Sequence, residues 1–299
     1  GHDAAFGADM IRLAARHGRG LPADVIPLEV SALAGFGHAE ILAALAPGFA
    51  EVSVLLSPTT ERDAPDREIP LAQAMAGGRP VRLLDLADPD ALCDALYDTG
   101  APAPLSEPVL PMGSRRQVAR LAARALNGEG ETLPLPDAAP YGAVLVDQDA
   151  CTLCLSCVSL CPSGALMDNE DLPQLRFQED ACLQCGICAT ICPEKAITLE
   201  PRMNLADSAL GQVVLNEEEP FACVECGVLF GSKSTIERIT EKLAGKHSMF
   251  GTSQAARMIQ MCENCRINAQ FNAADNPFAS GERPRPRTTE DYLSSRKDH

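Results

Sequence analysis

Short apolar runs alternate with longer amphipathic stretches over the first part of the chain. The runs 25–30, 51–57 and 81–86 (VIPLEV, EVSVLLS and VRLLDL) predict strands, because each is apolar or alternates in polarity over the length of a strand. Stretches with helical periodicity follow them at 38–46, 67–76 and 90–97. This alternation is typical of βαβ units. We therefore expect an α/β domain with a short, flavodoxin- or Rossmann-like parallel sheet at residues 1–130.

The pattern changes after one more predicted helix, 114–128, which begins with a Ser cap and ends at Asn-Gly. The following stretch, EGETLPLPDAAP, is rich in proline and acidic residues. Such a composition favours a connection over a regular element. We therefore expect a linker at residues 131–142.

A glycine-containing stretch, 31-SALAGFGHAE-40, follows the first predicted strand. The order of strand, glycine loop and helix would present backbone N–H groups to a phosphate, but the third glycine of GxGxxG is missing. Glycines also serve simple tight turns, and His38 reads more simply as a helix-start histidine with a satisfied hydrogen bond. Binding of a flavin or nucleotide by this domain stays open as an alternative.

Eight cysteines form two copies of one motif. Each copy reads C-x2-C-x2-C-x3-C-P, and the second repeats the first at an offset of about 31 residues. The members are Cys151, Cys154, Cys157 and Cys161 in the first copy and Cys182, Cys185, Cys188 and Cys192 in the second. A structural zinc site uses pairs of cysteines rather than quartets. A disulfide framework belongs to short secreted chains and does not suit a chain of 299 residues.

The motifs have the spacing of bacterial ferredoxins that hold two [4Fe-4S] clusters, and residues 143–202 resemble that α+β family. In the family, the fourth cysteine of each motif binds the other cluster. The resemblance therefore implies one cluster on Cys151, Cys154, Cys157 and Cys192, and a second on Cys182, Cys185, Cys188 and Cys161. It also implies one-electron transfer at low potential, with short outer strands at 143–146 and 196–200.

Four more cysteines form two CxxC pairs, Cys223 with Cys226 and Cys262 with Cys265, separated by a predicted helix at 232–245. Two such pairs supply the four thiolates of a tetrahedral structural zinc. A single iron or a further cluster also accepts four thiolates. We expect one Zn²⁺ in a small helical zinc-knuckle region, 203–275. The polar, proline-rich residues 276–299 predict an extended tail.

Charge and hydropathy limit the partners. The formal net charge is -16, which opposes binding to nucleic acid and favours a basic protein surface. No secretory or twin-arginine leader is visible, and no apolar run has the roughly 18 residues that a membrane span needs. We therefore expect a cytoplasmic protein that does not span a membrane.

Two weaker resemblances bear on function. Residues 26–56 distantly resemble the delta subunit of methyl-viologen-reducing hydrogenases, although the cysteine of that family's loop is missing here. The C-terminal part resembles ferredoxin-type proteins encoded beside molybdenum formate dehydrogenases. These resemblances imply a redox complex, with formate dehydrogenase subunits as the suggested partners. We expect an electron-transfer subunit or accessory protein rather than a catalytic subunit. The alternatives are a flavin- or nucleotide-binding oxidoreductase subunit and a non-catalytic assembly or sensor protein.

Overall fold

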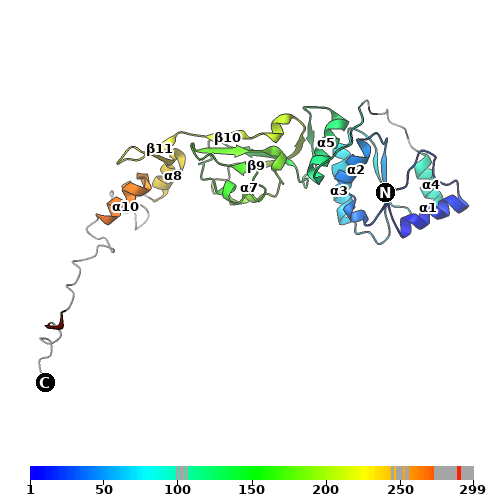
Figure 1. The fold of residues 1–299 in the computed structure, drawn as a ribbon, viewed down its shortest axis with the longest axis horizontal. Helices are drawn as coiled ribbons and strands as arrows, with labels where there is room; N and C mark the ends of the chain where they lie inside the picture. The colour runs from blue at the N-terminus through cyan, green and yellow to red at the C-terminus, as the bar shows by residue number, and fades with distance from the viewer. Residues whose placement is uncertain are drawn as a thin grey trace, which may run out of the picture. The chain divides into compact units, whose positions relative to one another are not determined.

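The computed structural model describes residues 1–98, 100, 105, 107–243, 246, 252, 256–272 and 288–290. The chain is a mixed α/β protein with several small sheets (Figure 1). It divides into two compact units, Gly1–Glu217 and Glu218–His299, which are described separately below. None of the described helices combines the length and apolar character that crossing a membrane requires. Apart from residues 288–290, the tail expected at 276–299 lies outside the described residues.

The N-terminal part of the first unit contains the predicted alternation of strands and helices. Strands β3 and β4 pair in parallel, with Val52 opposite Val81 and Leu55 opposite Leu84, and α3 connects them. A second parallel pair joins β1 to β2. Each of these sheets has two strands within the described residues, so the structure shows βαβ pairing but not a complete doubly wound sheet. The elements are β1 (His2–Asp3), α1 (Phe6–His17), β2 (Glu29–Val30), η1 (Leu33–Gly35), α2 (His38–Leu45), β3 (Val52–Leu55), α3 (Asp63–Met75), β4 (Val81–Leu84) and α4 (Pro89–Tyr97).

Helix α5 (Arg115–Asn127) connects this region to the cysteine-rich part of the unit. It begins at Ser114, whose side chain accepts a hydrogen bond from the backbone N–H of Gln117. Its buried residues are three alanines, Ala119, Ala122 and Ala123, together with Arg120. Helix α2 packs against α5 (Figure 1). The core that they share also includes Tyr141, Met203 and Leu205, so the two parts of the unit share one hydrophobic core.

The stretch expected to be a linker, residues 131–142, takes part in this core. Thr132–Pro134 forms strand β5, which pairs with Arg202–Asn204 of β9 (Ile197–Asn204). Ala139 and Tyr141 are buried. The segment is therefore one edge of the three-stranded sheet β5-β9-β6.

The two cysteine motifs fold as two halves related by the sequence repeat. Strand β6 pairs with β9, with Val146 opposite Ile197, and β7 pairs with β8, with Leu166 opposite Phe177. In the repeat, Val146 is equivalent to Phe177 and Ile197 to Leu166, so the two strand pairs are equivalent. Each pair combines one strand from before a cysteine motif with one strand from after the other motif. Strand β10 then extends the sheet beside β8. The remaining elements are β6 (Gly142–Val146), α6 (Ser156–Ser159), β7 (Leu166–Met167), β8 (Gln174–Phe177), η2 (Glu179–Ala181), α7 (Ile187–Ile191), η3 (Asp207–Leu210) and β10 (Val213–Glu217).

The second unit is built around a short hairpin. Strand β11 (Pro220–Ala222) pairs antiparallel with β12 (Leu229–Ser232). Helix α8 (Lys233–Leu243) follows where the sequence predicts a helix, and η5 (Met258–Gln260) and α10 (Glu263–Phe271) come after it. A small core joins Met261 to two of the cysteines, Cys223 and Cys262.

Candidate metal centres

The two cysteine loops have the same backbone shape. In each copy, three residues at equivalent positions adopt positive φ angles between 50° and 78°. They are Leu153, Leu155 and Gly164 in the first copy and Gln184, Gly186 and Lys195 in the second. This conformation costs energy for residues other than glycine, so its occurrence at matched positions in both copies shows that the fold requires the loop shape itself.

Backbone N–H groups point at the sulfurs inside these loops. The N–H of Gln184 lies 3.5 Å from Cys182 Sγ, and the N–H of Ala196 lies 3.3 Å from Cys192 Sγ. In the first copy, burial opposes ionisation of Cys161, but bonds from backbone N–H groups, including that of Ala165, lower its pKa overall. Ala165 and Ala196 are equivalent in the repeat. Such N–H to sulfur bonds stabilise thiolate ligands and tune the potential of a bound cluster.

The structure brings cysteines of the two motifs together across the halves. A small cavity is lined by Cys151, Cys154, Cys157 and Cys192, which are three cysteines of the first motif and the fourth of the second. On the other side, Cys182 and Cys188 have raised pKa values, first because they are buried and also because the charge of Cys161 acts on both. This grouping is the one that an exchange of fourth ligands requires.

Burial raises the pKa of three of these thiols, Cys157, Cys182 and Cys188, and so opposes their ionisation. For Cys157, burial and then the neighbouring charges of Cys151 and Cys154 raise the pKa to about 12. A thiol with that pKa is protonated at neutral pH. Iron would therefore have to displace the proton when it binds, which makes cluster assembly dependent on pH.

Gly142 at the start of β6 leaves room for the side chain of Gln184. The Gln184 amide donates to the carbonyl of Ala143 at 3.0 Å and to Cys182 Sγ at 3.5 Å. A Cβ on Gly142 would lie 2.3 Å from the carbonyl oxygen of Glu200 and 2.7 Å from the Gln184 amide. The absence of a side chain at this position thus protects both the strand pairing and a contact to a sulfur.

We expect Gly142→Ala to destabilise the folded protein by about 1 to 3 kcal/mol, because the clash involves a strand carbonyl that cannot move alone. Thermal unfolding of anaerobically purified protein measures the effect. Gly211→Ala is the control, since its Cβ would meet its nearest atom at 3.7 Å and its φ is -93°. An equal loss in both variants would contradict this account of Gly142.

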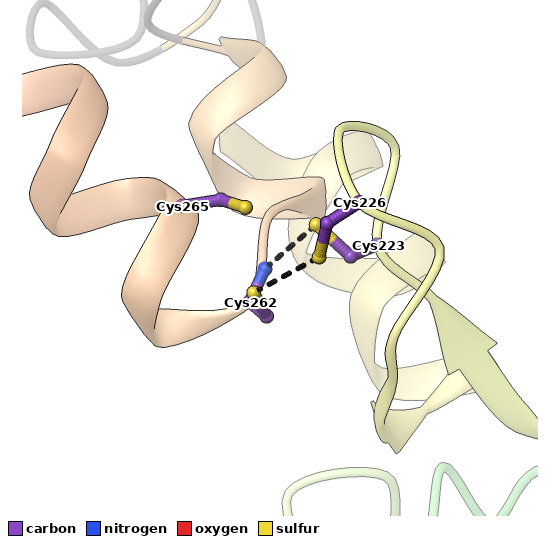
Figure 2. Close-up of side chains that lie close together, drawn as sticks. All are labelled: Cys223, Cys226, Cys262 and Cys265. Carbon is purple, nitrogen blue, oxygen red and sulfur yellow. Dashed lines mark hydrogen bonds between the residues drawn. The ribbon is translucent and has the colours of Figure 1, made fainter.

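The C-terminal cysteines form a tighter group (Figure 2). Cys223 and Cys226 lie on the loop between β11 and β12, Cys262 caps α10, and Cys265 lies in its first turn. The four sulfurs all lie within 4.8 Å of one another, and those of Cys226 and Cys262 are 3.6 Å apart. A tetrahedral zinc with Zn–S bonds near 2.3 Å would hold its sulfurs about 3.8 Å apart. The spacing therefore suits one metal ion.

A tight backbone turn follows the first CxxC pair, Cys223 and Cys226. Gly227 adopts a φ of 71°, and its N–H donates to the carbonyl of Cys223 at 2.9 Å. The N–H of Cys262 donates to Cys223 Sγ at 3.3 Å (Figure 2). Burial opposes ionisation of Cys223, but this bond and others from backbone N–H groups lower its pKa to about 6. One thiolate is thus favoured at neutral pH before a metal binds, as a metal site requires.

The glycine loop of the first unit meets carboxylates. The N–H of Gly37 donates to Glu40 and that of His38 to Glu68, both at 3.0 Å. The buried His38 ring contacts Glu68 through Nδ1 and the Tyr141 hydroxyl through Nε2, so its hydrogen bonds are satisfied as expected. Two carboxylates at the start of α2 would repel a phosphate group. This local geometry counts against the nucleotide alternative.

The comparison with known families gives the class of the central part. The model of the 4Fe-4S dicluster domain matches residues 150–197, which include all eight cysteines of the two motifs. No curated protein matched the chain. The chain therefore contains a ferredoxin-type iron–sulfur domain, and this match supports iron–sulfur electron transfer.

Proposed function

We propose that this protein passes single electrons through two [4Fe-4S] clusters as a subunit or accessory protein of a redox enzyme complex. The observation that carries the proposal is the pair of complete cysteine motifs, which fold as two matched halves within a region that fits a dicluster domain. Cluster A takes Cys151, Cys154, Cys157 and Cys192, and cluster B takes Cys182, Cys185, Cys188 and Cys161. The cavity beside the first set supports this division.

Each cysteine motif reaches the protein surface, as the exchange of electrons with a partner requires. Cys154 and Cys185 are exposed, one in each motif. Around Cys185, the apolar side chains of Leu183, Ile187 and Ile191 are at least 40% exposed. An exposed apolar patch beside a redox centre suits docking of a protein partner. With a net charge of -16, the partner surface is expected to be basic, and nucleic acid is not a partner.

The second unit takes a structural role in this proposal. A zinc ion on Cys223, Cys226, Cys262 and Cys265 fills its coordination shell and has no redox chemistry. It would fasten α10 to the hairpin formed by β11 and β12. The resemblance of the C-terminal part suggests that the partner complex is a formate dehydrogenase. We place the protein in the cytoplasm.

Reductive titration under anaerobic conditions tests the function. We expect the purified protein to take up about two electrons per chain, because each cubane accepts one, and to return them to a one-electron acceptor. Clusters that take up no electrons over the accessible range would favour the assembly or sensor alternative. A flavin absorbance in the purified protein would favour the oxidoreductase alternative.

A further inference from the structure

We infer that Arg116 is a positioning residue for cluster B, and that its charge makes this cluster easier to reduce than cluster A. The inference rests on the proposed function, since it requires that both clusters are present. Arg116 lies on α5, outside the cysteine motifs, and its guanidinium group reaches the loop that carries Cys182.

Three backbone carbonyls accept hydrogen bonds from this one side chain. Nη2 donates to the carbonyl of Cys182 at 2.7 Å, Nε to that of Asp180 at 2.5 Å and Nη1 to that of Pro140 at 2.7 Å. The guanidinium thus joins the start of the second motif to the segment before β6. Hydrogen bonds therefore fix Cys182 at two atoms, because Arg116 donates to its carbonyl oxygen and Gln184 donates to its Sγ.

The other side of the guanidinium is fixed as well. Its carbon lies 4.4 Å from the ring centroid of Tyr141, a stacking contact that is favourable for a cation. Tyr141 is itself buried and its hydroxyl lies 2.8 Å from His38 Nε2. Arg116 therefore cannot turn away from Cys182 without breaking an ordered set of contacts.

The positive charge of Arg116 is only partly neutralised. Its three hydrogen-bond acceptors are neutral carbonyls, and among the described residues no carboxylate lies within salt-bridge range of it. The nearby carboxylate of Asp180 lies 3.8 Å from Arg120. Reduction adds one electron to a cluster, and a fixed positive charge close by stabilises the added negative charge.

The sequence repeat supplies an internal comparison. Cys151 is the equivalent of Cys182 in the first motif, and its carbonyl accepts a bond from the amide of Asn216 at 3.4 Å. Asn216 is neutral, and its bond is longer than the 2.7 Å bond from Arg116. At this position the two halves thus differ in charge. Cluster B therefore has the higher potential, and in a singly reduced protein the electron resides on it.

Redox titration followed by EPR spectroscopy on the full chain tests the inference. We expect Arg116→Gln to shift the potential of cluster B to a more negative value and to leave that of cluster A in place. Arg116→Lys, which keeps the charge, should retain most of the original value. The matched control is Arg115→Gln, which removes a charge from the adjacent exposed residue that pairs with Glu40 at 2.8 Å. It should shift neither potential.

Two outcomes would overturn the inference while leaving the proposed function intact. One is an unchanged pair of potentials in Arg116→Gln with both clusters present, and the other is an equal shift of both. If Arg116→Gln fails to assemble cluster B, the potentials are measured in Arg116→Lys instead. A cluster B potential in Arg116→Lys as negative as that of cluster A would also overturn the inference. A wild-type protein without two clusters would instead refute the proposed function. The variant Cys192→Ala, expected to keep only cluster B, assigns the signals.

Discussion

Cys192→Ala is expected to remove the cluster held by Cys151, Cys154 and Cys157, while the cluster beside it in sequence survives. The reason is the exchange of fourth ligands, in which Cys192 completes the shell of the distant motif. Iron and sulfide should each fall from about eight to about four per chain. Metal and sulfide analysis with EPR spectroscopy of the reduced protein measures the loss.

The mirror variant is the matched control. Cys161→Ala should remove the cluster on Cys182, Cys185 and Cys188 and keep the other one. The two variants should therefore leave different EPR signals with equal iron content. If Cys192→Ala instead loses the cluster formed by its own motif, the exchange of ligands is refuted.

Cys262→Ser is expected to release the zinc ion and loosen the second unit without changing the reduction of either cluster. Three thiolates and a hydroxyl bind zinc more weakly, and the N-terminal end of α10 depends on this cysteine for its attachment to the hairpin. Zinc should fall from about one per chain to near zero. Hydrogen exchange should become faster in α8 and α10.

The control for this variant is Glu263→Gln, an exposed change at the next residue of α10. It should keep the zinc and the slow exchange. Iron in the wild-type site, with a redox signal that disappears in Cys262→Ser, would refute a structural zinc and make the protein a carrier with three redox centres.

The pattern of apolar and polar residues and the cysteine repeat were sufficient to predict two parts of the fold. The parallel pairing of β3 with β4 follows from apolar runs separated by a helix, and the matched halves follow from the cysteine repeat. Strand β5 was not predictable in this way. Its residues, Thr132–Pro134, lie in a proline-rich stretch and become a strand only because β9 extends far enough to pair with them.

The side chains that contact the cysteines were the other feature that could not be predicted from the sequence. Arg116 is one of several arginines on an amphipathic helix, and nothing in its spacing sets it apart from Arg115. Its role depends on the packing of α5 against residues more than 60 positions away. Gln184 lies inside a motif, yet only the structure shows its amide directed at Cys182 Sγ.

The central claim is that one chain holds two cubane clusters, and chemical analysis of anaerobically purified wild-type protein tests it most directly. The account predicts about eight iron atoms and about eight acid-labile sulfides per chain. A content of about four of each, in protein whose eight motif cysteines are intact and which has suffered no oxidative loss, would contradict it.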